Sequence, residues 1–520
     1  MISVTIGLFM AAPAAYIVMR ALGADAETWA RLLSARVPSL LGSTLSLTLA
    51  VTALTILMAV PAAWLAVRTD VPGKRFWQWS LALPLAIPPY IGGFAFITLF
   101  GPRGLLQQQL SETLGIPPHE LSIPSIYSFA GALIVLSLFT YPYVFLLVSA
   151  ALRSHNQNLI DAAKSSGLSP RRVFSRVTLP LLRPGMAAGG LLVALYVLSD
   201  FGAITLLRYP TFTSVIYQQL VGRYDRQAAA VLSMVLMLIT IAVIWLEWRS
   251  RAKVRYFQTA SFRPAETVRL SRWKWPAVIF LSLLFFAALI LPLSVLSYWS
   301  VIGISQGALT SDFSRYALNS FFASFLAASA AVLLAFPVAY LATRHGGLFS
   351  HGVLRLSYSG YALPGVLVGL GMVFFFNSAI PWLYGTLAVL ILAYIIRFLP
   401  QCLQAEESGL ASISPVLEEA ARSMGHGTAK VVRRVTVPLM FPSMAAGWVL
   451  VFLSAMKELP VTLMLRPAGF DTLAVRVWID ASEGFFATAA LPSLLLVLAS
   501  AGPLMFVIRR RYSLRTGRSE

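Results

Sequence analysis

Charged residues are scarce in this chain of 520 residues. Asp, Glu, Lys and Arg together make up 12% of it, against roughly 25% in ordinary soluble domains. A soluble protein of this length needs a charged surface that such a composition cannot supply. The only cysteine, Cys402, excludes an internal disulfide and a cysteine-rich metal site. The five histidines are scattered through polar segments and predict no metal cluster.

Motifs of nucleotide chemistry are also missing. No G-x-x-x-x-G-K-[ST] segment occurs, because Gly73-Lys74 lacks the preceding glycine and is followed by Arg75. We find no nucleophile elbow, zincin motif or glycine-rich dinucleotide fingerprint. We therefore predict that the chain is not an enzyme and binds no cofactor, and that any ATP hydrolysis takes place on another subunit.

Apolar residues, in contrast, make up 58% of the chain. They form about twelve stretches near the roughly 20 residues that a helix needs to cross a bilayer. We place these stretches at about 2–22, 42–67, 77–100, 127–152, 186–206, 228–248, 276–301, 318–343, 354–376, 384–402, 444–465 and 487–508. The first has no basic flank or signal-peptidase site and is expected to be retained. The sequence predicts an all-α polytopic membrane protein.

The formal net charge is +20, and the positions of the basic residues indicate why the chain is so positive. Most of the lysines and arginines fall in alternate loops, including Lys74-Arg75, Arg171-Arg172, the run Arg249–Lys274 and Arg509–Arg511. By the positive-inside rule, these loops and both termini face the cytoplasm. The basic excess predicts contact with anionic membrane lipid, and we expect no nucleic-acid partner.

The two halves of the chain repeat one another. Residues 43–68 align with 319–344 at a constant offset of 276, which pairs Pro61 with Pro337. Further along, the offset is 258 and pairs Pro184 with Pro442. Six spans in each half give both halves the same orientation. We predict a first half at 1–248, a cytoplasmic linker at 249–275 and a second half at 276–520, in tandem and parallel.

A short signature occurs once in each half, with identical spacing. The first copy is Asp161-Ala162-Ala163 followed by Gly167, and the second is Glu419-Ala420-Ala421 followed by Gly425. We expect each acid to start a short helix, where the helix dipole favours it. We expect each glycine to form a left-handed turn after that helix. The alternative is an ordinary amphipathic loop that lies on the bilayer.

Three charged residues lie inside predicted spans, at positions that the repeat relates. They are Asp200 in the fifth span and Lys457-Glu458 in the eleventh. A charge at membrane depth is costly and usually faces a cavity or a partner. These residues either line a translocation path or form a buried structural pair such as Asp200 with Lys457. Arg397, near the end of the tenth span, is expected to be an interfacial anchor.

The repeated signature resembles the EAA loop of permeases of binding-protein-dependent ABC importers. In that family the loop docks on a separate ATPase. The resemblance therefore implies that Asp161, Ala162, Ala163 and Gly167, and likewise Glu419, Ala420, Ala421 and Gly425, bind two copies of a cytoplasmic ABC ATPase. The first copy has Asp161 where the family usually has glutamate, which keeps the charge.

Two longer segments, 196–217 and 457–474, are similar to the fused, double-length permeases of ferric-iron importers. This resemblance implies a bacterial inner-membrane permease that imports iron(III) delivered by a periplasmic binding protein. Fused permeases for thiamine, phosphonate or polyamine are organised similarly and stay open as alternatives. A secondary transporter of twelve helices is the alternative from another class, but the repeated loop argues against it.

Overall fold

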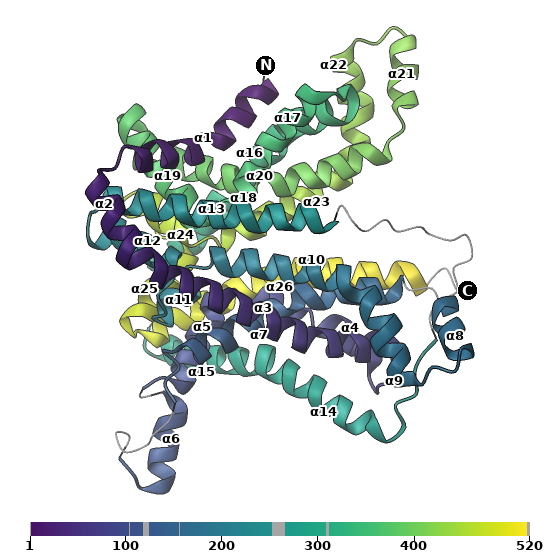
Figure 1. The fold of residues 1–520 in the computed structure, drawn as a ribbon. Coiled ribbons are helices and arrows are strands. Elements are labelled where there is room, and N and C mark those ends of the chain that lie inside the picture. Colours follow the sequence, from purple (N-terminus) through teal and green to yellow (C-terminus); the bar gives the residue numbers. More distant parts are fainter. Residues whose placement is uncertain are drawn as a thin grey trace. The chain divides into compact units, whose positions relative to one another are not determined.

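The chain folds almost entirely into helices in the structure, a computed structural model (Figure 1). The structure describes residues 2–102, 104–117, 124–154, 157–251, 266–307 and 311–516. Within these residues, strand pairing is limited to one isolated parallel bridge, between Thr69 and Val268. The predicted all-α class is confirmed.

The α-helices up to residue 251 are α1 (Ile2–Leu22), α2 (Ala26–Arg31), α3 (Val37–Arg68), α4 (Lys74–Ser80), α5 (Pro89–Phe100), α6 (Leu105–Leu114), α7 (Phe129–Arg153), α8 (Gln157–Ser165), α9 (Pro170–Val173), α10 (Leu179–Ser199), α11 (Gly202–Leu206), α12 (Phe212–Tyr217) and α13 (Arg226–Arg251). Those that follow are α14 (Lys274–Phe285), α15 (Leu291–Ser305), α16 (Ser311–His345), α17 (Leu348–Ser357), α18 (Ser359–Ala362), α19 (Gly365–Ala379), α20 (Leu387–Ser412), α21 (Pro415–Ser423), α22 (Thr428–Val431), α23 (Val437–Met456), α24 (Pro460–Leu465), α25 (Leu473–Glu483) and α26 (Phe486–Thr516).

Nine helical stretches in the described part of the chain are long and apolar enough to cross a membrane. A tenth is a bent pair, Lys74–Ala86 with Pro89–Leu114, whose halves meet at 89°. Two further apolar helices, Gly365–Ala379 and Phe486–Gly502, are shorter. These three elements lie where the remaining predicted spans were expected. The structure thus has nine or ten full spans among its described residues, against about twelve predicted.

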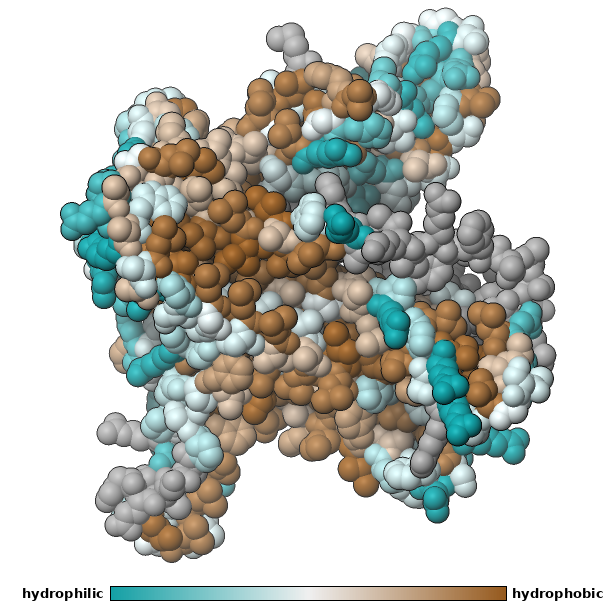
Figure 2. All heavy atoms as spheres, viewed as in Figure 1, coloured by the Kyte–Doolittle hydropathy of each residue, from teal (hydrophilic) through white to brown (hydrophobic). Residues whose placement is uncertain are grey.

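The long helices carry apolar side chains on their outer surfaces. Leu57 in α3 is 70% exposed and Leu333 in α16 is 71% exposed. Hydrophobic residues cover much of the face seen in Figure 2. A helix satisfies its backbone hydrogen bonds within its own segment, so an apolar surface of this kind is stable in lipid. The outer surface therefore agrees with a membrane-spanning fold.

The helices group into two compact units, and each unit is discontinuous in sequence. The first unit comprises Met1–Val37, Val215–Leu238 and Gly307–Ile479. In it α16, α20 and α23 pack against one another, and α1 packs on α17 and α19. A Cβ atom added to Gly371 of α19 would come within 2.7 Å of Pro13, because α1 and α19 approach closely. Helix α1 therefore belongs to a core built mainly from the second sequence half.

The second unit comprises Pro38–Ser214, Ile239–Gln306 and Asp480–Glu520. In it α7 packs on α5 and α10, and α15 packs on α26 and α5. Helices α15 and α26 thus join a core built mainly from the first sequence half. The division into 1–248, 249–275 and 276–520 concerns the sequence repeat and stays a prediction, since residues 252–265 lie outside the described residues.

Candidate functional site

The two copies of the repeated signature lie on the short helices α8 and α21. Helix α8 begins at Gln157, so Asp161 lies in its second turn. Helix α21 begins at Pro415, and proline is favoured at the first position of a helix. Glu419 is therefore also in the second turn. The prediction that each acid starts its helix is wrong, because both helices begin one turn earlier.

The glycines of the signature end these helices in left-handed turns, as predicted. The φ angles of Gly167 and Gly425 are 78° and 83°. After α8, the N–H of Gly167 donates to the carbonyl of Lys164 (2.9 Å), and the N–H of Leu168 donates to that of Ala163 (3.3 Å). This pair of bonds is the Schellman arrangement, which favours glycine at the left-handed position.

The same two bonds follow α21. The N–H of Gly425 donates to the carbonyl of Arg422 (2.9 Å), and that of His426 to Ala421 (3.3 Å). A Cβ atom built on Gly425 would meet nothing within 4 Å. Glycine is therefore required by the backbone conformation and not by a lack of space.

Each helix exposes a small apolar face. Leu159 on α8 is 52% exposed, and its repeat counterpart Leu417 on α21 is 49% exposed. Ala162 and Ala420, which follow on the same helices, are also exposed. Met424 is 70% exposed at the end of α21. These side chains lie outside the spans and offer a partner a surface of small and flexible apolar groups.

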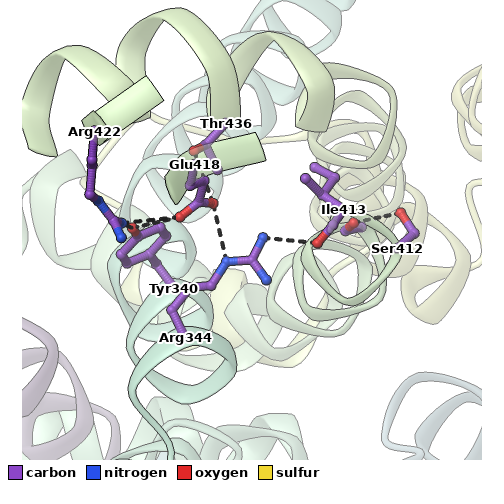
Figure 3. A network of polar contacts seen from close by, with 8 residues as sticks. Tyr340, Arg344, Ser412, Ile413, Glu418, Arg422 and Thr436 are labelled. Carbon is purple, nitrogen blue, oxygen red and sulfur yellow. Dashed lines mark hydrogen bonds and ion pairs between the residues drawn. The ribbon is translucent and has the colours of Figure 1, made fainter. Parts of the chain in front are cut away.

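A buried carboxylate fastens α21 to its unit (Figure 3). Glu418, which is 2% exposed, pairs with Arg344 of α16 at 3.1 Å. Its carboxylate also accepts hydrogen bonds from the hydroxyls of Tyr340 (3.0 Å) and Thr436 (3.1 Å). Arg422, one turn further along α21, lies 3.4 Å from the same carboxylate. Both oxygens of the Glu418 carboxylate are therefore hydrogen-bonded, as a buried charge requires.

The anchor was not predicted from the sequence, which drew attention to the neighbouring Glu419. Glu419 is exposed and faces away from the unit. Helical periodicity contained the missing signal. Glu418 lies three residues before Ala421, and residues at that spacing share a helix face. Both are buried, at 2% and 3% exposure.

Helix α8 has no equivalent carboxylate. Ile160, which is 6% exposed, lies 258 residues before Glu418 and thus occupies its place in the repeat. Asp161 instead accepts a hydrogen bond from the side-chain amide of Gln157 (2.9 Å). The two loops therefore share their turn and exposed face but differ in how they are held.

The charged residues inside the spans lie at matching helix breaks. Helix α10 ends at Ser199, and Asp200 follows it; the Oδ1 of Asp200 accepts hydrogen bonds from the N–H groups of Ala203 and Ile204, both at 3.1 Å. Glu458 follows the end of α23, and its Oε1 accepts from the N–H of Val461 (3.2 Å). Both carboxylates thus cap the short helix that follows the break, and both are buried, at 7% and 6% exposure.

Arg397 distinguishes the two breaks. Its Nε lies 2.9 Å from Oε2 of Glu458, and the arginine side chain is 19% exposed. The prediction of an interfacial anchor is wrong, because the guanidinium is an ion-pair partner inside the unit. Phe139 occupies the corresponding position of the repeat, 258 residues earlier, so the first half has no arginine at the place of Arg397. Lys457 is half-buried next to Glu458.

The described residues contain no group of three His, Cys, Asp or Glu side chains that could hold a metal ion. The candidate sites in this part of the chain are the short helices α8 and α21 and the two capped breaks. None of them carries a nucleophile with an adjacent base, as covalent catalysis would require.

Comparisons with known proteins agree with this arrangement. Residues 59–252 and 327–511 each match the family of the binding-protein-dependent transport system inner membrane component. The chain is 31% identical over 511 residues to a protein of Haemophilus influenzae described as "Fe(3+)-transport system permease protein FbpB 2", covering 97% of this chain and 96% of that protein. It is 24% identical over 467 residues to the "Ferric transport system permease protein FbpB" of Actinobacillus pleuropneumoniae, covering 84% and 66%.

A third relative resembles only part of the chain. The "Molybdenum transport system permease protein ModB" of Escherichia coli is 32% identical over 161 residues, which cover 30% of this chain and 67% of that protein. The repeat predicted from the sequence thus corresponds to two family domains in tandem. The chain belongs to the family of binding-protein-dependent transport system inner membrane components, and it is a multi-pass inner-membrane permease of an ABC importer that leaves ATP hydrolysis to another subunit.

Proposed function

We propose that this chain is the complete membrane core of an iron(III) importer. One copy would bind two copies of a cytoplasmic ABC ATPase, one through α8 and one through α21. The observation that carries the proposal is the pair of intact docking helices, each with the same terminal turn and the same exposed apolar face. A permease with a single family domain would need a second copy of itself to present two such helices.

Iron(III) as the substrate rests on similarity to the ferric permease of Haemophilus influenzae along nearly the whole of both chains. The similarity to the molybdenum permease is confined to one part and supports only the permease role. Thiamine, phosphonate and polyamine are the substrates to exclude. The family assignment argues against the secondary transporter, because family members depend on a binding protein and an ATPase.

Uptake measurements in a strain that lacks the chromosomal gene test the substrate. We expect the restored chain to raise uptake of radiolabelled iron(III) and to leave uptake of molybdate, thiamine and putrescine unchanged. A chain with Gly167→Val and Gly425→Val is the matched control for expression without coupling. Uptake of another substrate in place of iron would contradict the assignment.

Native mass measurement of the purified complex tests the stoichiometry. We expect one permease chain with two ATPase subunits. Two permease chains with two ATPases would contradict the proposal. The proposal also places α8, α21 and both chain termini on the cytoplasmic side, where the ATPases lie, and leaves the opposite side to the periplasmic binding protein. Anionic lipid would surround the basic cytoplasmic loops.

A second part of the proposal concerns the translocation path, which Asp200, Lys457 and Glu458 would border. Iron(III) is a hard cation that prefers oxygen ligands. The absence of a three-ligand cluster among the described residues supports weak contacts along the path and tight binding on the delivery protein alone. Equilibrium dialysis of the purified chain against iron(III) citrate should detect no stoichiometric, tight site, and finding one would refute this part.

A further inference from the structure

The end of the predicted linker is fixed to the end of α3. The N–H of Val268 donates to the carbonyl of Arg68 (2.7 Å), and the N–H of Asp70 donates to the carbonyl of Val268 (3.1 Å). The Asp70 carboxylate then accepts from the N–H of Leu270 (2.8 Å) and lies 3.0 Å from Nζ of Lys274. Residues 266–274, which we call the linker strap, are therefore held by both backbone and side-chain contacts.

The linker strap also reaches the first docking helix through one buried amide. The N–H of Glu266 donates to Oε1 of Gln157 (3.0 Å), the first residue of α8. The Nε2 of the same Gln157 amide donates to Oδ1 of Asp161, the acid of the docking signature (2.9 Å). Gln157 is 1% exposed, so its amide would be costly to leave without these two partners.

Arg68 also takes part in this contact, which stands in the first half where the second half has the ion pair of Arg344 with Glu418. Its Nη2 lies 3.5 Å from Oε1 of Gln157, whereas its Nη1 is buried and has no hydrogen-bond partner among the described residues. Arg68 lies 276 residues before Arg344, so it is the repeat counterpart of the arginine that pairs with Glu418. The first half thus keeps the arginine of the anchor and lacks its carboxylate, because Ile160 stands there.

We propose that the linker strap is the positioning element of the first docking helix and does for α8 what Glu418 does for α21. The linker would then have a role beyond joining the halves, since it holds Gln157 and, through it, the docking signature. The role in coupling rests on the proposed docking of the ATPase to α8. The positioning itself does not, and it can be measured without the ATPase.

The first experiment removes one backbone donor from the linker strap. Val268→Pro deletes the N–H that bonds Arg68, and Thr267→Pro is the matched control because no bond of the Thr267 N–H is among those seen. Amide hydrogen exchange is followed by mass spectrometry in the full-length chain in nanodiscs, without ATPase. We expect exchange in residues 157–165 to rise on the order of tenfold in Val268→Pro, while α21 and the control stay unchanged.

The second experiment tests whether a carboxylate can replace the linker strap. Gln157→Leu should accelerate exchange in α8 to a similar extent. Adding Ile160→Glu to Gln157→Leu should restore slow exchange, because the new carboxylate meets Arg68 as Glu418 meets Arg344. Restoration in the double variant would be hard to explain by a merely damaged fold. Unchanged exchange of α8 in either Val268→Pro or Gln157→Leu, or no restoration by Ile160→Glu, would overturn the proposal.

Co-purification of the ATPase separates this inference from the proposed function. If α8 loosens in Val268→Pro and ATPase binding weakens, both stand. If α8 loosens and the ATPase binds as before, the linker strap still positions α8, but the docking role of α8 is refuted. If α8 does not loosen, the inference fails whatever the ATPase does.

Discussion

Replacing Glu418 by glutamine should release α21 from its unit. The variant keeps the shape of the side chain but removes the charge that Arg344 requires at 3.1 Å. Deleting one partner of a buried ion pair costs about 3–5 kcal/mol. Arg344 retains a hydrogen bond to the carbonyl of Ile413 (3.1 Å), so we take the lower value, about 3 kcal/mol.

This energy translates into a measurable opening of α21. Since 1.4 kcal/mol corresponds to a factor of ten, the amides of α21 should exchange roughly 100-fold faster in Glu418→Gln. The assay is hydrogen exchange by mass spectrometry on the full-length chain. Glu419→Gln is the control, because that residue is also a glutamate, is adjacent and is exposed. It should leave exchange within about a factor of two.

An equal response to the two glutamine variants would refute the anchor. So would slow exchange of α21 in Glu418→Gln. A further variant combines Glu418→Leu with Arg344→Met. Replacing both members of a buried pair by apolar residues is often neutral or stabilising, so this double variant should exchange more slowly than Glu418→Gln. If it does not, the faster exchange of α21 in Glu418→Gln comes from altered packing and not from the charge of Arg344 left without its partner.

Three further results are expected. Gly167→Val with Gly425→Val should leave the chain at normal abundance in the membrane and sharply reduce transport, because a left-handed residue with a side chain costs about 1–2 kcal/mol at each helix end; loss of the protein from the membrane would count against this. Asp200→Asn should keep the thermal stability of the unaltered chain, since asparagine also caps a helix, but should slow iron uptake by removing a charge from the proposed path. Glu458→Gln should lower the thermal stability, because it leaves the guanidinium of Arg397 without its carboxylate; equal stability of the two variants would contradict the ion-pair role of Glu458. Hydrogen bonds from the linker strap hold the pKa of Asp70 below its usual value. The contribution of Asp70 to holding the strap is therefore present at neutral pH and is lost as the pH falls through that lowered pKa. In limited proteolysis, the strap of the unaltered chain should be cut faster at low pH than at neutral pH, whereas Asp70→Asn should show no such change with pH.

The sequence was sufficient for features that depend on composition and on local backbone chemistry. The long apolar runs predicted most of the spans, because a helix in lipid needs only length and few charges. Gly167 and Gly425 were predicted correctly because a left-handed turn strongly favours glycine. The acids of the signature were placed one turn wrongly, since helix boundaries depend on weak and competing signals.

The partners of buried charges could not be predicted in this way. Arg397 and Glu458 are 61 positions apart in sequence, and nothing in the local pattern of either one names the other. Glu418 was overlooked because the family motif begins one residue later, while burial depends on how α21 packs against α16. The contact of the linker strap with Gln157 was equally hidden, because it joins a backbone N–H to a side chain more than 100 residues away.

The membership of α1 in a unit built mainly from later residues has a consequence for synthesis. Helix α1 leaves the ribosome about 340 residues before α19, its packing partner, which at bacterial rates is a delay of roughly 20–70 s. During that time α1 must wait in the bilayer with its future contact face against lipid or an assembly factor. The other unit has the reverse order, because it contains α15 and α26 and stays incomplete until α26 is made. Neither sequence half can therefore finish folding by itself, because each unit needs helices from the other half. A single continuous chain ensures that both halves enter the same membrane in equal number.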